Sequence, residues 1–592
     1  MTVTGWLTIF LFVGVVTALA IPFGSYLAAV YSGERTWLDP IMRVPERWAY
    51  RIMRVDPARE QNWKQYAKSL IIFSLAGWIL IYIILRSQGL WSFTGLNPMG
   101  FHSAPASVTF NTASSFLTNT NWQYYGGETT MSYFSQMAGL AVQNYASAAV
   151  GIVVAVALIR GIAGRSSTSL GNFYQDVVRT ILWILLPLSF LISLVLVSQG
   201  SIQNFSHYLS FHGIQNIAQT IAMGPVASQE AIKLLGTNGG GFFNVNSAHP
   251  FENPTAFTNF FEMVVVLLIP AALVFAYGKM VGSRRQGYAI YSTMMVMFLG
   301  AVIVCYIAEA HGSPAQHAAG LHTGVIAGST GGNLEGKEQR FGIAGSAIFN
   351  VVTTVTSCGA VNSALESFTG IGGAVPFANL SASEVIFGGV GTGLYSILLY
   401  VLLAVFIGGL MVGRTPEYLG KKIGAREIKL VALGILITPL SALFCTALAT
   451  ASSAGRASID TAVSGAGPQG FSETFYAYLS QANNNGSAFA GYTGFVQPNA
   501  GNVGSHGINL ADFLGGGAML FARYAPILFA LAVAGSLAGK RVSPAGLGTM
   551  RTDNGTFVVL LIGVIILVGA LTFFPALLLG PVVQGLTGHL YS

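Results

Sequence analysis

Long apolar runs recur along the chain and are separated by polar loops. Ten of these runs approach the roughly 20 residues that a helix needs to cross a bilayer. They cover residues 6–30, 70–85, 137–159, 181–197, 257–277, 289–308, 386–412, 428–448, 519–537 and 557–579. The pattern predicts an all-α polytopic membrane protein with about ten transmembrane helices.

Four short segments rich in Asn and Gly lie between the middle eight runs, each at the end of a weakly apolar stretch. They read TNTN at 118–121, TNGG at 237–240, SCGA at 357–360 and NNGS at 484–487. Their matching residues Asn121, Gly239, Gly359 and Gly486 recur at intervals of 118, 120 and 127 positions. Irregular backbone at membrane depth is tolerated only where it is buried in protein or lines a water-filled path. We therefore expect four repeats of helix, short pore helix, loop and helix, with one extra helix at each end.

Glycine at these positions suits the path of a cation. An ion that leaves water must exchange its hydration shell for other oxygens, which rings of backbone carbonyls supply. Glycine readily adopts the backbone angles that aim successive carbonyls at one axis, and Asn121 belongs to the residue type that tolerates positive φ best after glycine. The hydroxyls of Thr118, Thr237 and Ser357 either add ligands or cap the preceding pore helix. Ordinary turns use the same residue types, but fourfold spacing between predicted spans favours pore loops.

The distribution of charged residues agrees with this arrangement of spans and loops. The chain has 592 residues, of which 53% are hydrophobic and only 8% charged, with a net charge of +7. Most Lys and Arg fall in alternate loops, and such loops are cytoplasmic. This bias predicts that both termini are extracytoplasmic, and it explains the positive charge without a nucleic-acid partner. The three cysteines stand far apart in apolar surroundings and indicate neither a disulfide framework nor a zinc site.

The spans and loops divide the chain into six parts. The division predicts a first transmembrane helix with a basic cytoplasmic loop (1–65), pore repeat 1 (66–165), pore repeat 2 (166–285), pore repeat 3 (286–425), pore repeat 4 (426–550) and a last transmembrane helix (551–592).

Four sequence stretches carry a resemblance to a known family. They are NTASSFLTNTNWQ from Asn111, GTNGGGFFNVNSAHPFENPT from Gly236, TSCGAVNS from Thr356 and NNNGSAFAG from Asn483. They resemble the potassium-binding subunit, KdpA, of the bacterial Kdp potassium-transporting ATPase, and the likeness spans nearly the whole chain.

The resemblance implies a potassium-channel-like arrangement in the bacterial inner membrane. It implies that potassium binds in a four-loop selectivity filter on the outer side and passes through an intramembrane tunnel to a P-type ATPase subunit, KdpB. The small subunits KdpC and KdpF and membrane lipid would complete the assembly. The implied potassium ligands are Asn119, Thr120, Asn121 and Gln123; Thr237, Asn238 and Gly239; Ser357, Cys358 and Gly359; and Asn484, Asn485 and Gly486.

Two charged residues are further candidates, for gating or exit of the ion. Arg523 matches a basic residue near the inner end of the family's pore, and a charge inside a span is a functional hypothesis by default. It would block direct leakage into the cytoplasm, or else only brace neighbouring helices. Glu384 precedes a Gly-rich run and would attract cations toward a sideways exit, or else be a solvated carboxylate at a helix start.

Three functions remain open on the sequence. The first is the ion-selecting subunit of an ATP-driven potassium pump. The second is a stand-alone channel or symporter of the Trk, Ktr and HKT kind, which shares the four-repeat plan. The third is a membrane enzyme, which the absence of clustered His, Cys or carboxylate residues in the spans disfavours. The sequence also lacks the Asp-Lys-Thr-Gly phosphorylation motif of P-type pumps, so we expect no ATP hydrolysis by this chain.

Overall fold

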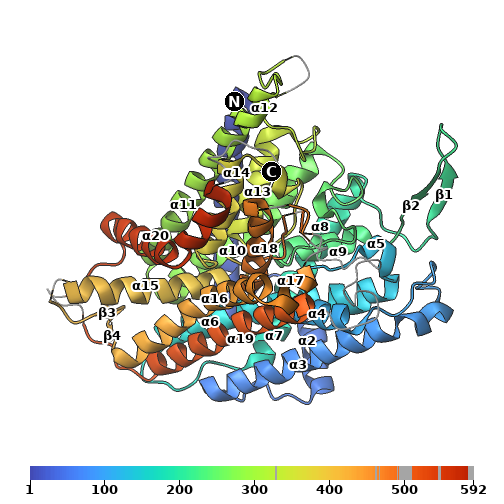
Figure 1. The fold of residues 1–592 in the computed structure, drawn as a ribbon. Helices are drawn as coiled ribbons and strands as arrows, with labels where there is room; N and C mark the ends of the chain where they lie inside the picture. The colour runs from blue at the N-terminus through green and yellow to red at the C-terminus, as the bar shows by residue number, and fades with distance from the viewer. Residues whose placement is uncertain are drawn as a thin grey trace.

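The computed structural model describes residues 1–326, 330–411, 413–459, 463–465, 467–489, 491–492, 510–544 and 549–583. Within this part of the chain, ten helical stretches are long and apolar enough to cross a membrane. They are formed by α1 (Val3–Ser32), α3 (Trp63–Ser87), η2 with α6 (Ser135–Ala141, Val142–Ala163), α7 with η3 and α8 (Phe173–Arg179, Thr180–Leu185, Leu186–Ser198), α10 (Ala256–Met280), α11 (Arg284–His311), α15 (Thr392–Met411), α16 (Ala425–Ala451), α19 (Leu510–Ala538) and α20 (Gly555–Leu577). The prediction of about ten spans is confirmed (Figure 1).

The spans differ in how far the protein covers them. The stretches Ser135–Ala163 and Ala256–Met280 are 83% buried, whereas those of α1, α3 and α20 are only 28% buried. α6 and α10 therefore form the centre of the molecule, and α1, α3 and α20 expose apolar side chains as helices in contact with lipid do. Figure 1 shows α15, α16 and α19 running side by side, and α16 packs against both others.

Four shorter helices lie between the spans and precede the four Asn/Gly-rich segments. They are α4 (Ala106–Leu117), α9 (Val226–Leu235), α13 (Gly342–Val355) and α18 (Gly467–Ala482). Nearly all of their residues are buried. The order of span, short helix, segment and span thus occurs four times.

The seventh span is shorter than the apolar pattern predicts. The predicted start at residue 386 is wrong, because α15 begins at Thr392 and is preceded by an unwound stretch. In this stretch Ser383, Glu384 and Phe387 have positive φ angles of 59°, 59° and 65°, which a helix does not accommodate. The helix before it, α14 (Gly370–Ser381), has 12 residues and is too short to cross a bilayer.

The remaining elements lie in the connections. The helical ones are α2 (Asp39–Met53), η1 (Gln88–Thr94), α5 (Gly127–Thr130), η4 (Asn246–Ala248), α12 (Pro314–Ala318), η5 (Leu365–Ser367), α17 (Ser453–Ile459) and η6 (Leu578–Val582). Two small antiparallel hairpins pair β1 (Leu209–His212) with β2 (Ala218–Ile221) and β3 (Glu417–Tyr418) with β4 (Lys421–Lys422). The β1–β2 hairpin projects from the body of the molecule (Figure 1).

Candidate functional site: a ring of four loop segments

The four segments share one backbone conformation. We number them segment 1 (118–123), segment 2 (236–241), segment 3 (356–360) and segment 4 (483–487). Each has positive φ at two positions separated by one residue, and these pairs are Asn119 and Asn121, Thr237 and Gly239, Ser357 and Gly359, and Asn484 and Gly486. The structural equivalent of Thr237 and Ser357 in segment 1 is therefore Asn119 and not Thr118.

The residue between each positive-φ pair is held in the same way in all four segments. Its backbone N–H donates to the carbonyl five residues earlier, in the last turns of the pore helix. The four bonds are Thr120 N to Ser115 O at 2.9 Å, Asn238 N to Lys233 O at 2.7 Å, Cys358 N to Thr353 O at 3.0 Å and Asn485 N to Ser480 O at 2.9 Å. Fourfold repetition at this level confirms that the segments are equivalent.

The segments lie next to one another in chain order and close into a ring. A side chain at Gly239 would overlap the carbonyl oxygen of Cys358 in segment 3, and one at Gly359 would overlap that of Asn485 in segment 4. A side chain at Gly486 would overlap the carbonyl oxygen of Thr120, which returns to segment 1. Glycine is thus required at three of the four positions by close approach of backbone as well as by φ.

One backbone carbonyl at the same position of each segment has no hydrogen-bond partner among the described residues. These carbonyls belong to the residues between the positive-φ pairs: Thr120, Asn238, Cys358 and Asn485. All four residues are buried, and among the described residues no hydrogen bond ends on their carbonyl oxygens. Buried carbonyls are nearly always paired, so four unpaired ones at equivalent positions can coordinate a cation.

Amide side chains of segment 1 hold segment 2 in place. Asn121 Nδ2 donates to Gly239 O at 2.8 Å, and Asn119 Nδ2 donates to Thr237 O at 2.9 Å. Gln123 exchanges two hydrogen bonds with the backbone of Gly241, at 2.9 and 3.0 Å. These donations from amide nitrogens brace the neighbouring backbone. The Oδ1 atom of Asn121 has no hydrogen-bond partner among the described residues and stays available to a cation.

Several other predicted ligand side chains also point into the protein. Asn238 Nδ2 donates to Ser147 on α6 at 3.0 Å, and Asn485 Nδ2 donates to Thr353 O at 2.8 Å. Asn484 Nδ2 donates to the hydroxyl of Thr120 at 2.9 Å, which links segment 4 to segment 1. The amide nitrogens of these side chains are thus engaged within the protein, whereas Asn238 Oδ1 has no hydrogen-bond partner among the described residues.

The predicted roles of three hydroxyls separate in the structure. Thr118 donates to Ser114 O at 2.8 Å and so completes the end of α4. Thr237 accepts from the backbone N–H of Val390 at 2.9 Å, which ties segment 2 to the unwound stretch before α15. The hydroxyl of Ser357 is buried without a partner among the described residues and remains free to act as a ligand.

A buried lysine lies behind segment 2. Lys233 in α9 is 1% exposed, and its Nζ donates to Gly240 O at 2.8 Å. The same ammonium group lies 2.5 Å from a carboxylate oxygen of Glu230 and 2.5 Å from one of Glu252. Glu252 in turn accepts from the backbone N–H of Phe243 at 2.8 Å. This cluster connects the pore helix, segment 2 and the loop that follows it.

Lys233 is a residue that the sequence analysis does not name as part of the site. The structure buries it in a pore helix. A lysine flanked by apolar residues within a predicted pore helix was the signal available, because a charge at membrane depth requires a partner.

The ring lies between a large cavity and a small one. The larger, which we name the vestibule, has a volume of about 850 Å³ and is lined by residues of all four segments, among them Gln123, Gly240, Gly359 and Gly486. Glu128 also lines it, and its carboxylate accepts from the backbone N–H of Asn244 at 2.9 Å. Burial raises the pKa of Glu128 above its ordinary value.

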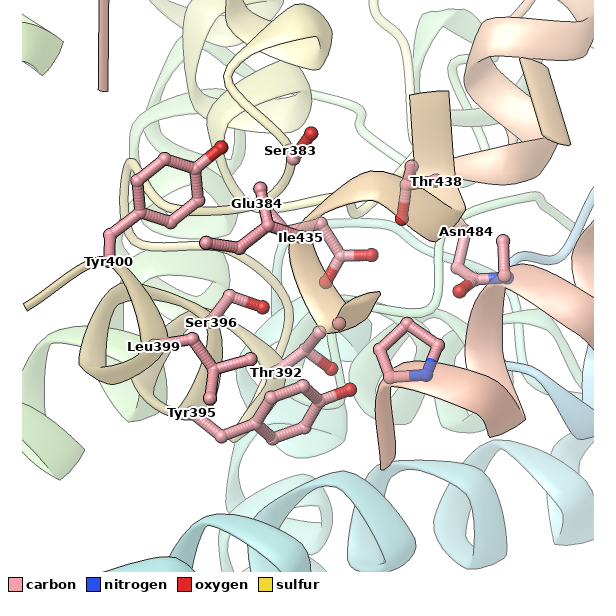
Figure 2. A pocket seen from close by; sticks show the side chains of 13 residues that line it. Ser383, Glu384, Thr392, Tyr395, Ser396, Leu399, Tyr400, Ile435, Thr438 and Asn484 are labelled. Carbon is pink, nitrogen blue, oxygen red and sulfur yellow. The ribbon is translucent and has the colours of Figure 1, made fainter. Parts of the chain in front are cut away.

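The smaller cavity, which we name the lower cavity, has a volume of about 20 Å³. Glu384, Thr392, Thr438 and Asn484 contribute to its lining. Figure 2 shows the carboxylate of Glu384 pointing into the space between these side chains. Because Glu384 precedes α15 by several residues, the interpretation as a carboxylate at a helix start is wrong.

Arg523 is buried next to the lower cavity. It lies in α19, is 3% exposed, and its Nη1 donates to the hydroxyl of Thr392 at 2.6 Å. Thr392 also lines the lower cavity. Glu384 thus lines the lower cavity itself, and Arg523 contacts another residue of its lining.

The chain is similar to known proteins over nearly its full length. The model of one protein family, described as the potassium-transporting ATPase A subunit and abbreviated KdpA, matches residues 10–586. The chain belongs to this family. Among its relatives, a protein of Mesorhizobium japonicum is 50% identical over 99% of both chains, and one of Granulibacter bethesdensis is 52% identical over the full length of both. A protein of Methylorubrum extorquens is 52% identical over 99% of this chain and 98% of its own.

All three relatives carry the name potassium-transporting ATPase potassium-binding subunit. Among solved structures, the chain is similar to the potassium transporter TrkH from Vibrio parahaemolyticus, with a TM-score of 0.45 and 15% sequence identity over 76% of this chain and 84% of that one.

Proposed function

We propose that this chain is the potassium-selecting subunit of an ATP-driven potassium uptake pump in the bacterial inner membrane. Potassium enters the vestibule, loses water in the ring of segments 1 to 4, and continues toward a P-type ATPase subunit, KdpB. The proposal rests on membership of the KdpA family and, above all, on the four unpaired carbonyls at equivalent positions in the ring.

The ring supplies the chemistry that potassium needs. Carbonyl oxygens replace the hydration shell without the binding strength of a full charge, so that the ion can both bind and leave. The C-terminal ends of α4, α9, α13 and α18 meet at the ring, and the partial negative charge of a helix C-terminus favours a cation there. We assign binding to the backbones of the residues that the sequence analysis names, with Asn119, Asn121, Gln123 and Asn238 as braces.

The lower cavity provides a next position along the route. Its volume of about 20 Å³ accommodates roughly one water-sized particle, and a dehydrated potassium ion is of similar size. Glu384 attracts the ion to this cavity, and the guanidinium of Arg523 opposes its passage straight into the cytoplasm. The sideways route left open would be the tunnel to KdpB.

Arg523→Ala tests this assignment. Without the guanidinium, we expect ATP hydrolysis to become uncoupled from potassium uptake, or potassium to leak passively, while the ring keeps its ion preference. Transport and ATPase activity of the complex in reconstituted vesicles measure both quantities. Normal coupling without a leak would make Arg523 a brace for Thr392 only.

Dependence on partner subunits separates the pump from the alternative of a stand-alone channel or symporter of the Trk, Ktr and HKT kind. Purified in mild detergent, the chain should bring along KdpB, with KdpC and KdpF. Potassium-stimulated ATPase activity should occur in that complex and not in this chain alone. Gradient-driven potassium uptake by vesicles that contain only the purified chain would favour the alternative.

The proposed topology has both termini outside and the connection from α1 to α3 in the cytoplasm. Lys337, an obvious outer position, is a poor labelling site because its side chain is buried 2.8 Å from a carboxylate oxygen of Glu309. Gln339 and Arg47 are both exposed, and the three native cysteines are buried. In intact cells an impermeant thiol reagent should label Gln339→Cys and not Arg47→Cys; labelling of Arg47→Cys would overturn the threading.

A further inference from the structure

α2 exposes an apolar stripe on the side that faces away from the protein. Ile41, Val44, Trp48 and Ile52 are 65%, 56%, 57% and 76% exposed, and Trp37 just before the helix is 74% exposed. Their spacing of three and four residues places them on one face of the helix. This stripe is the most continuous apolar surface in the connection between α1 and α3.

The polar side of α2 is the side that attaches it to the protein. Glu46 is buried, and its Oε1 lies 2.9 Å from Arg179 Nε in α7 and accepts from the hydroxyl of Tyr50 at 2.7 Å. Asp39 at the start of the helix accepts from the indole N–H of Trp183 in η3 at 3.3 Å. Because these polar contacts hold one side of α2 against the protein, the apolar stripe on the other side faces away from it.

A second stripe on α2 consists of arginines. Arg43, Arg47 and Arg51 follow one another at intervals of four residues and are all exposed, so they form a row beside the apolar stripe. The Arg51 guanidinium lies 5.3 Å from the centre of the Trp48 ring. Arginines next to tryptophans and aliphatic side chains are the composition of helices that lie in a membrane interface.

The neighbouring elements extend the apolar surface. α2 lies between the end of α1 at Ser32 and the start of α3 at Trp63, which are two of the three spans that the protein covers least. Ile72 and Leu75 of α3 are 51% and 54% exposed. The two spans that flank α2 in the chain thus also expose apolar side chains, as helices in contact with a bilayer do.

We propose that α2 docks on the membrane surface where α1 ends and α3 begins. The apolar stripe enters the boundary between headgroups and acyl chains, and Arg43, Arg47 and Arg51 bind lipid phosphates, with a preference for anionic headgroups. Tryptophan favours the interface for its amphipathic ring, and each arginine near an anionic surface adds to the binding. The contact is independent of the ion route.

Depth-dependent fluorescence quenching tests the docking. A fluorophore is attached to Trp48→Cys or Ile52→Cys in the assembled complex, with Ala58→Cys, an exposed position beyond the helix, as the matched control. In vesicles containing phospholipids brominated on their acyl chains, positions 48 and 52 should be strongly quenched and position 58 should not. Equal quenching at all three positions, or protection of position 48 by cross-linking to another subunit, would overturn the proposal.

The headgroup preference has its own readout at the same probe. Brominated phosphatidylglycerol should quench position 48 more than brominated phosphatidylcholine does, and each of Arg43→Gln, Arg47→Gln and Arg51→Gln should reduce that preference by up to about fivefold. Potassium-stimulated ATPase activity verifies that each variant complex is assembled. Equal quenching by both lipids in labelled Trp48→Cys with all three arginines present would contradict the role of the arginines, while the comparison of positions 48 and 58 decides the docking.

Discussion

Segments 1 and 2 reach the same backbone geometry with different side chains. At the second positive-φ position, segment 2 has Gly239. The carbonyl oxygen of Cys358 lies so close to Gly239 that no side chain fits there. Segment 1 has Asn121, with a φ of 52° and a side chain that donates to Gly239 O at 2.8 Å and to Asn144 Oδ1 at 3.0 Å. A departure from glycine is thus accommodated at the one junction of the ring where a side chain finds space and partners.

The two segments are also supported differently from behind. The carbonyl that receives the N–H of the central residue belongs to Ser115 in the first pore helix and to Lys233 in the second. Only the residue behind segment 2, Lys233, has a charged side chain, and its ammonium group donates to Gly240 O in the loop. Segment 1 braces its neighbour through neutral amides, whereas segment 2 is braced by a buried ion pair. Different sensitivities to substitution follow from this contrast.

The largest effect is expected for Gly239→Asp. A side chain at this position strains the left-handed backbone by about 1–2 kcal/mol and collides with the carbonyl of Cys358, so that the ring must open. Because about 1.4 kcal/mol changes an equilibrium tenfold, potassium affinity should fall tenfold or more. Selectivity against rubidium and ammonium should relax. The potassium, rubidium, ammonium and sodium dependence of ATPase activity in the complex measures both.

Gly240→Asp is the matched control. A Cβ at Gly240 would lie 3.0 Å from Asn121 O, a tight contact that a small shift relieves. Its φ of 68° carries the same backbone strain, so the difference between the two variants isolates closure of the ring. Equal loss of affinity in both would mean that strain alone, and not the approach of segment 3, decides the effect.

A slightly smaller effect is expected for Lys233→Met. The change removes the support of Gly240 O and leaves Glu230 and Glu252 without their cation, a disruption that costs about 3–5 kcal/mol in buried pairs. The KM for potassium should rise several-fold at an unchanged maximal ATPase rate in complexes that assemble, and Lys233→Arg should restore part of it. A loss of assembled complex at normal KM would limit Lys233 to stability.

Asn121→Gly should have a modest effect. Glycine keeps the positive φ but removes the bonds to Gly239 O and Asn144, and a net contribution of about 1 kcal/mol for a hydrogen bond corresponds to a roughly fivefold weaker potassium affinity. Asn121→Ala, which lacks the amide and disfavours the backbone angle, should be worse than glycine. The reverse order would show that the flexibility of glycine costs more than the unfavourable backbone angle of alanine.

The smallest effect concerns Glu128, which links the loops after segments 1 and 2 at the vestibule. Since burial raises its pKa, this carboxylate takes up a proton at a higher pH than an ordinary Glu and loses its attraction for cations as the pH falls through that raised pKa. Glu128→Gln should increase the KM for potassium slightly at neutral pH and flatten its rise toward acidic pH. An unchanged pH profile of KM would remove Glu128 from the account.

The apolar pattern predicted the ten spans because helix length and hydropathy are local properties. The Asn/Gly-rich segments predicted the glycines of the ring, because positive φ favours particular residue types. The break before α15 was missed because Val385, Ile386 and Phe387 are apolar in either conformation, and only tertiary contacts such as Thr237 to Val390 fix the unwound form.

The bracing of the ring was not predictable in the same way. Lys233 pairs with Glu252, nineteen positions further along the chain, and Asn119 donates a hydrogen bond to Thr237 in another repeat. The sequence analysis assigned the Asn residues to the ion, and the structure shows that their amide nitrogens also bond to neighbouring protein groups. The sequence analysis did not single out α2, because its arginines lower the mean hydropathy of this stretch.

The central claim is that potassium is coordinated by the carbonyls of Thr120, Asn238, Cys358 and Asn485. Anomalous diffraction from crystals of the complex in rubidium, a heavier ion of similar size, tests it most directly. The account predicts an anomalous peak enclosed by these four oxygens, reduced in Gly239→Asp and retained in Arg523→Ala. A peak confined to the lower cavity or the vestibule, with none in the ring, would contradict it.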